Sequence, residues 1–311
     1  MDQSTRPALA LLTMAVLLLV RAEIAAQNRV DFSRSSEGGE ISIQTRLISL
    51  TVSVSDDSGR YFPGLNREAF TVYEDGVVQK ITHFSVVDQA ASIAIIFDVS
   101  SSMKGKKFDR AAFALTRFIK TTHRDDVFSL VSFNDRADLL LDSISDAEVM
   151  SVKVNEILPR GNTALYDGVA LGLRHVTRGK RSKHALVVIT DGQDNCSRLS
   201  GGQLRRMVEE AGVPIYTILI DNFLIDRSGK TLIEELSETT GGRSFSPHGE
   251  DGINEAFDQI ALELRHQYSI GYEPLNFNSD GKWRRLKAEV APPPGTRRLV
   301  IRNRKGYFAH K

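Results

Sequence analysis

A continuous apolar run, residues 93–97 (IAIIF), ends directly at Asp98. A run this short and this apolar is typical of a strand buried on both faces, as in a parallel sheet. Apolar residues then recur at helical spacing over residues 108–119, and apolar strands and helical stretches alternate as far as residue 264. This alternation predicts an α/β domain over residues 91–266, built on an open, doubly wound and mainly parallel sheet.

The segments on either side of this domain have the pattern of strands. Residues 41–55 alternate between apolar and polar, and Asp75-Gly76 separates two β-rich runs, which is a strong hairpin signal. From residue 267 onward short strand-like runs are separated by turns, and this tail is too short to fold alone. We therefore predict that residues 41–90 and 267–311 pack together as one small all-β, sandwich-like domain.

The N-terminal residues 1–26 have the pattern of a secretory signal. Arg6 precedes an apolar run over residues 7–20, and the small residues Ala25 and Ala26 stand where a signal peptidase would cut. We expect cleavage there, a flexible polar linker over residues 27–40, and export to the periplasm or the extracellular space. The alternative is an uncleaved N-terminal membrane anchor, which would be the protein's contact with the membrane.

The net charge bears on which partners the protein can attract, and the cysteine content bears on what stabilises its fold. The formal net charge is +1, so no global field favours nucleic acid or an anionic membrane surface. The single cysteine, Cys196, excludes an intramolecular disulfide. An exported chain without disulfides must be held together by its core.

Three groups of oxygen-bearing side chains follow the predicted strands or precede a helix. Asp98, Ser100 and Ser102 follow the run at residues 93–97, Thr163 lies in a loop before a helix, and Asp191 follows a later apolar strand. Ligands bind outside the carboxyl ends of the strands in open α/β sheets. Oxygen donors without histidine or thiolate suit a hard cation, so we predict a Mg²⁺ site, with Mn²⁺ or Ca²⁺ as alternatives.

Each group also has a simpler interpretation, as a helix cap or a turn. The metal site is predicted by the three groups together and in this order. We further predict that four residues on the same face contact a partner, although they also suit solvated loops. These residues are Tyr166, Asp167, Asp194 and Asn195.

The order Asp98-x-Ser100-x-Ser102, then Thr163, then Asp191 resembles the metal-ion-dependent adhesion site of von Willebrand factor A domains. The resemblance spans roughly residues 91–265. It implies a Rossmann-like fold with a divalent ion at the top of the sheet. It also implies that the serine and threonine hydroxyls coordinate the ion directly and the aspartates directly or through water. Two flanking motifs, GLNREAF at residues 64–70 and YSIGY at residues 268–272, resemble a narrower, acidobacterial-type group of bacterial proteins related to these domains.

A divalent cation held by five oxygen ligands of the chain keeps a sixth coordination position, which a Glu or Asp carboxylate of a protein partner can take in place of water. We therefore expect an exported, adhesion-type protein-binding module that takes neither nucleic acid nor a small-molecule substrate. We do not expect an enzyme, because aspartyl-nucleophile phosphatases need a second acid where this chain has Ser100, and the sequence holds no Gly-x-Ser-x-Gly or His-Glu-x-x-His motif. The alternatives are a structural scaffold of the cell envelope with a stabilising metal, and a metal-dependent hydrolase.

Overall fold

The structure, a computed structural model, describes residues 47–309 apart from residues 87, 88, 180, 221–230, 250, 294, 296 and 297. All of the described residues lie within one compact unit, Thr45–Lys311. The predicted signal at residues 1–26 and the linker at residues 27–40 lie outside the described residues. No helix in the described part of the chain is long and apolar enough to cross a membrane.

A six-stranded sheet forms the centre of the α/β domain, with the strand order β10-β9-β8-β5-β6-β7. Neighbouring strands are parallel except β7, which runs antiparallel to β6 at one edge. The strands are β5 (Ala91–Asp98), β6 (Val127–Phe133), β7 (Ala137–Ile144), β8 (Lys183–Thr190), β9 (Ile215–Leu219) and β10 (Arg243–Phe245). Every residue of the central strand β5 is buried, as its uninterrupted apolar sequence predicts.

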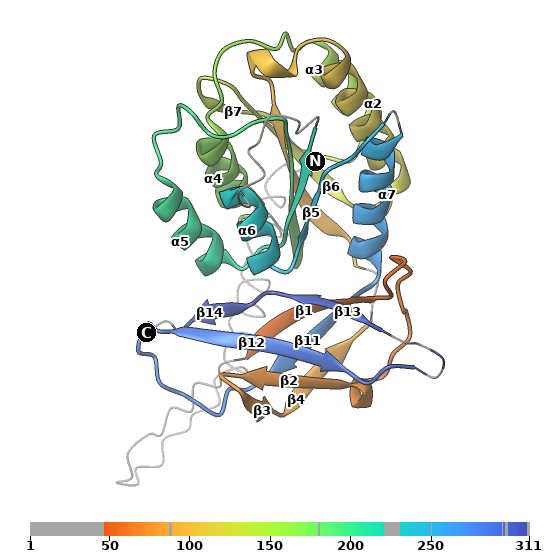
Figure 1. Ribbon diagram of the computed structural model, residues 1–311, viewed down its shortest axis with the longest axis vertical. Coiled ribbons are helices and arrows are strands. Elements are labelled where there is room, and N and C mark those ends of the chain that lie inside the picture. The colour runs from red at the N-terminus through yellow and green to blue at the C-terminus, as the bar shows by residue number, and fades with distance from the viewer. Residues whose placement is uncertain are drawn as a thin grey trace, which may run out of the picture. The chain divides into compact units, whose positions relative to one another are not determined.

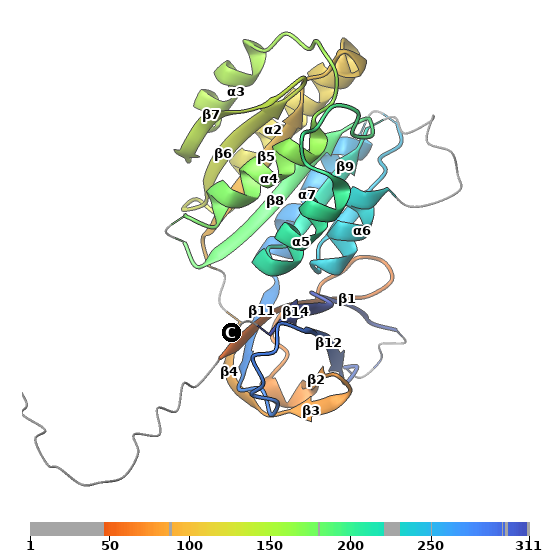
Figure 2. The same cartoon turned by 90° about the vertical axis from the view of Figure 1, so that its left-hand side faces the viewer.

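Helices cover both faces of this sheet (Figures 1 and 2). One face packs against α2 (Lys106–Thr121), α3 (Ala147–Asn155) and α7 (Gly252–Arg265). The other face packs against α4 (Leu165–Val176), α5 (Gly201–Ala211) and α6 (Leu232–Thr239). Strand β5 supplies both cores, because successive side chains of a strand point to opposite faces. Ile93, Ile95 and Phe97 lie in the first core, and Ala94 and Ile96 lie in the second.

The β domain consists of two four-stranded sheets, with the orders β13-β1-β11-β4 and β14-β12-β2-β3. Its N-terminal elements are β1 (Ile48–Ser55), the 3₁₀ turn η1 (Arg67–Ala69), β2 (Phe70–Glu74), β3 (Val77–Gln79) and β4 (Ile81–Ser85). Its C-terminal elements are β11 (Gln267–Tyr272), β12 (Trp283–Val290), β13 (Val300–Asn303) and β14 (Gly306–Phe308). All pairings in both sheets are antiparallel. Both sheets therefore combine strands from the two ends of the described chain, which confirms the predicted fold class.

The predicted hairpin at Asp75-Gly76 is present between β2 and β3. Both turn residues have positive φ, +48° and +85°, as a tight turn between twisted strands requires. The inner faces of the two sheets enclose an apolar core that includes Leu50, Val52 and Tyr268.

A buried carboxylate, Glu263 of α7, links the α/β domain to the β domain. It accepts hydrogen bonds from the Ser53 hydroxyl at 2.9 Å, the Tyr61 hydroxyl at 2.9 Å and the Tyr216 hydroxyl at 3.3 Å. The Arg302 guanidinium lies 3.8 Å from the same carboxylate. Glu263 is fully buried, so these four partners, and not water, surround and stabilise its carboxylate.

Candidate metal site

Asp98 is the last residue of β5 and lies at the carboxyl end of the parallel sheet. Its side chain is fully buried and both of its oxygens accept hydrogen bonds. The Ser100 backbone N–H donates to Oδ1 at 2.9 Å, and the hydroxyl of Thr190, the last residue of β8, donates to Oδ2 at 2.6 Å. These bonds fix the carboxylate at the junction of two neighbouring strands.

The other predicted ligands follow in a chain of hydrogen bonds from this point. Ser102 belongs to the short 3₁₀ turn η2 (Ser101–Met103), and its hydroxyl lies 3.0 Å from the Ser100 hydroxyl. The Ser102 hydroxyl also donates to Asp191 Oδ1 at 2.7 Å. The structure therefore brings Ser100, Ser102 and Asp191 together beside Asp98, as their positions after the strands predict.

The loop that carries Thr163 is hydrogen-bonded to the loop that carries Ser100. The Ser101 N–H donates to the Gly161 carbonyl at 3.0 Å, and the Arg160 N–H donates to the Val99 carbonyl at 2.8 Å. These two bonds hold the loop before α4 against the loop that carries Ser100. Thr163 itself is buried, and its N–H donates to Asn195 Oδ1 at 2.9 Å.

Burial raises the pKa of Asp98 to about 6, although the hydrogen bonds from Ser100 and Thr190 act in the opposite direction. The nearby Asp191 carboxylate contributes to the increase. An ionised Asp98 is therefore costly in this environment unless a positive charge lies close to it.

The donor set fits a hard divalent cation. The two carboxylates and three hydroxyls supply only oxygen ligands. Mg²⁺ prefers such ligands, whereas softer metals favour thiolate or imidazole groups. Over the described ranges no group of three or more His, Cys, Asp or Glu residues could hold a metal ion. A cation at this site would thus rely on the serine and threonine hydroxyls in addition to Asp98 and Asp191.

One charged residue beside the site was missed by the sequence analysis. Lys107, in the first turn of α2, donates from Nζ to Asp191 Oδ2 at 2.7 Å. Its spacing from Asp98 carries no recognisable signal, because the contact depends on how the helix turns back toward β8. Asp191 therefore accepts from the Lys107 ammonium at Oδ2 and from the Ser102 hydroxyl at Oδ1.

Gly161 is required by the loop that presents Thr163. Its φ is +81°, and a Cβ at this position would lie 2.3 Å from Asp135 Oδ2. The Asp135 carboxylate is already held, because its Oδ1 accepts from the Asn162 N–H at 3.0 Å and from Asn162 Nδ2 at 2.8 Å. The Asp135 side chain can therefore move away from a Cβ at residue 161 only by losing these hydrogen bonds.

Gly161→Ala is expected to destabilise the protein by roughly 1–3 kcal/mol, because alanine is strained at positive φ and displaces Asp135. Thermal unfolding in EDTA measures this loss. Gly192→Ala is the matched control, since a Cβ at Gly192 meets no atom within 4 Å. Equal melting temperatures for the two variants would contradict this account of the loop.

Three of the four predicted partner-contact residues use their side chains within the protein. Asp194 Oδ1 accepts from the Tyr166 N–H at 3.1 Å, and Asp167 accepts from the Arg198 and Leu199 N–H groups, both at 3.1 Å. Asn195 holds Thr163, as described above. These contacts attach the loop after Asp191 to the start of α4. Contact of Tyr166, Asp167, Asp194 and Asn195 with a partner stays a prediction.

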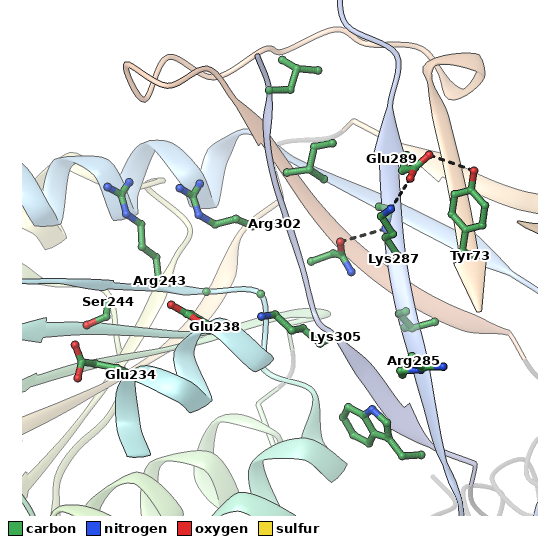
Figure 3. A pocket seen from close by; sticks show the side chains of 18 of the residues that line it. Tyr73, Glu234, Glu238, Arg243, Ser244, Arg285, Lys287, Glu289, Arg302 and Lys305 are labelled. Carbon is green, nitrogen blue, oxygen red and sulfur yellow. Dashed lines mark hydrogen bonds and ion pairs between the residues drawn. The ribbon is translucent and has the colours of Figure 1, made fainter. Parts of the chain in front are cut away.

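A large open groove of about 1460 Å³ lies apart from the metal-site residues, and none of those residues lines it. Strand β10 and helix α6 form one side, and strands β12 and β13 form the other. Figure 3 shows the Arg243 and Arg302 side chains next to each other, while Lys287 pairs with Glu289 at 2.6 Å. The groove mixes cationic and acidic side chains, so it presents no uniform charge to a ligand.

Comparisons with known proteins show what part of the chain is similar to. Residues 93–193 match the model of the von Willebrand factor type A domain. An uncharacterized protein of Borreliella burgdorferi is 28% identical over 212 residues, which cover 60% of this chain and 60% of that protein. Inter-alpha-trypsin inhibitor heavy chain H3 of Mesocricetus auratus is 24% identical over 148 residues, 43% of this chain and 17% of that protein. The chain thus spans less than two thirds of either relative.

Two solved structures illustrate the structural similarity. Proximal thread matrix protein 1 from the mussel byssus, in a structure with a zinc-occupied MIDAS motif, has a TM-score of 0.48 at 19% identity and covers 61% of this chain and 49% of that chain. An aerotolerance-related membrane protein from Bacteroides fragilis has a TM-score of 0.46 at 19% identity, over 56% of this chain and 98% of that chain.

The order of the aspartate and hydroxyl residues, the doubly wound sheet and the matching family model agree with one another. The resemblance of the flanking segments to a narrower bacterial group stays a prediction. Residues 93–193 are thus similar to a von Willebrand factor type A domain.

Proposed function

We propose that this protein is an exported module that binds a protein partner through a divalent cation. The ligands are Asp98, Ser100, Ser102, Thr163 and Asp191. The observation that carries the proposal is the continuous set of hydrogen bonds from Thr190 through Asp98, Ser100 and Ser102 to Asp191 at the carboxyl end of the sheet. This set holds oxygen donors from two strands in one place.

Mg²⁺ is the proposed cation, with Mn²⁺ or Ca²⁺ able to replace it, and when bound it supplies a coordination position for an oxygen of the partner. The fixed hydrogen bonds of Asp98 and Ser102 hold the ligands before the cation arrives, so little side-chain entropy is lost on binding. A Glu or Asp carboxylate of the partner supplies both an oxygen and a negative charge.

Binding without catalysis is the favoured role, because Asp98 is poorly placed to react. It is fully buried, so a substrate cannot reach its oxygens, although each oxygen accepts one hydrogen bond and keeps a lone pair for a small cation. Export is supported by the signal pattern at residues 1–26 and places the partner in the periplasm or outside the cell.

A metal-dependent capture experiment tests the proposed function. The chain from Gln27 is incubated with envelope extract in Mg²⁺ or in EDTA. An Asp98→Ala, Ser100→Ala double variant is treated in the same way. The control is Asp109→Ala, which alters an exposed aspartate of α2. We expect the wild type and the control to retain a partner in Mg²⁺ only. The double variant should bind that partner with an affinity reduced about tenfold or more, which corresponds to ~1.4 kcal/mol.

Two results would contradict the proposal. Capture that ignores both the metal and the double substitution would assign binding to another surface. Metal that stabilises the fold without any metal-dependent partner would favour the alternative of a structural scaffold.

A further inference from the structure

An ion pair between Lys107 and Asp191 lies beside the candidate metal site. Lys107 Nζ lies 2.7 Å from Asp191 Oδ2, and the Asp191 side chain is only 2% exposed. The Lys107 side chain is 30% exposed, so its ammonium reaches the site from the solvent-facing side of α2. The five predicted ligands do not include this group, and its charge alters the electrostatics of all of them.

The formal charges give the sign of the effect. Asp98 and Asp191 contribute −2 and Lys107 contributes +1, so the site carries −1 before a cation binds. A divalent cation changes this total to +1, whereas the same site without Lys107 would reach 0. Because Asp98 and Asp191 are almost fully buried, water screens these charges weakly.

We propose that Lys107 lowers the intrinsic affinity of the site for divalent cations and leaves the loaded site with a net positive charge. An anionic group of the partner neutralises that charge, so the cation and the partner bind cooperatively. This inference rests on the proposed function, because it concerns the same site. Coupling of this kind is reciprocal, so the partner must raise metal affinity by the same factor as the metal raises partner affinity.

Lys107 also positions Asp191. With Oδ2 held by the ammonium, Oδ1 is left to the Ser102 hydroxyl at 2.7 Å. Removing the ammonium alone would leave a nearly buried carboxylate with one neutral donor, which is costly in the metal-free protein. Lys107 thus stabilises the metal-free state and opposes the metal-bound state.

Mn²⁺ titration followed by electron paramagnetic resonance tests this inference in the absence of partner. The variants are Lys107→Met, Lys107→Arg and Lys106→Met, the last an exposed neighbour in the same turn. We expect Lys107→Met to bind Mn²⁺ at least about tenfold more tightly than the wild type, because it removes one unit of repulsion. Lys107→Arg keeps the charge and should stay within about threefold of the wild type, as should Lys106→Met.

Thermal unfolding supplies a second readout that does not depend on measuring affinity. In EDTA, Lys107→Met should melt below the wild type, and Mn²⁺ should raise its melting temperature by more than it raises that of the wild type. Acetate, as a simple carboxylate probe, should tighten Mn²⁺ binding to the wild type more than to Lys107→Met.

The inference is overturned if Lys107→Met binds Mn²⁺ with equal or lower affinity while the wild type binds it normally, and the proposed function then stands. If neither protein binds Mn²⁺, the metal site itself is wrong and both proposals fail. If Lys107→Met tightens Mn²⁺ binding but the wild type captures no partner, the effect on affinity stands and the proposed partner binding fails.

Discussion

Glu263→Ala is expected to lower the free energy of unfolding by roughly 3–5 kcal/mol, because it removes one member of a buried ionic network. The substitution leaves the Arg302 charge without its carboxylate 3.8 Å away. It also leaves the hydroxyls of Ser53, Tyr61 and Tyr216 without their common acceptor. Since these partners come from both domains, the loss should affect the whole described unit and not one helix.

Urea unfolding followed by circular dichroism measures this effect. Glu263→Gln keeps the size and one acceptor oxygen, so it should cost less, about 1–3 kcal/mol. Glu255→Ala, an exposed position on the same helix, should stay within about 0.5 kcal/mol of the wild type. If Glu263→Ala unfolds at the same urea concentration as Glu255→Ala, the buried network does not hold the domains together.

Mg²⁺ at about 100 times its dissociation constant is expected to add about 2.7 kcal/mol to the free energy of unfolding, since it binds only the folded site. Asp98→Asn should abolish this response, because the substitution removes one of the two carboxylates. Without metal, Asp98→Asn should melt at or above the wild-type temperature, because it removes a buried charge while keeping the size of the side chain.

Paired thermal melts in EDTA and in Mg²⁺ measure both effects on one instrument. Asp109→Asn, at an exposed position of α2, is the control and should respond to Mg²⁺ as the wild type does. A full Mg²⁺ response in Asp98→Asn would show that the stabilising cation lies elsewhere.

Features set by local pattern were predictable from the sequence. The apolar run before Asp98 is typical of a strand buried on both faces, and the structure buries every residue of β5. The Asp75-Gly76 hairpin followed from turn chemistry alone. Asp98, Ser100, Ser102 and Asp191 could be placed together because the carboxyl ends of parallel strands meet at one edge of the sheet.

Features that depend on long-range packing were not predictable. The pairing of Lys107 with Asp191 joins residues separated by 84 positions, and that of Ser53 with Glu263 joins residues separated by 210. No periodicity specifies such pairs. The sequence likewise did not show that the Asp167 carboxylate accepts hydrogen bonds from backbone N–H groups of the neighbouring loop.

The arrangement of β1 has a consequence for the order of folding. Both strands that pair with it, β11 and β13, are made only after the entire α/β domain. During synthesis β1 therefore emerges with both edges open and must wait for distant partners, which makes its pairing slow. All strands of the α/β sheet come from one continuous stretch of chain, so this domain is free to form first. Among the described residues, we therefore expect the β domain to be completed last.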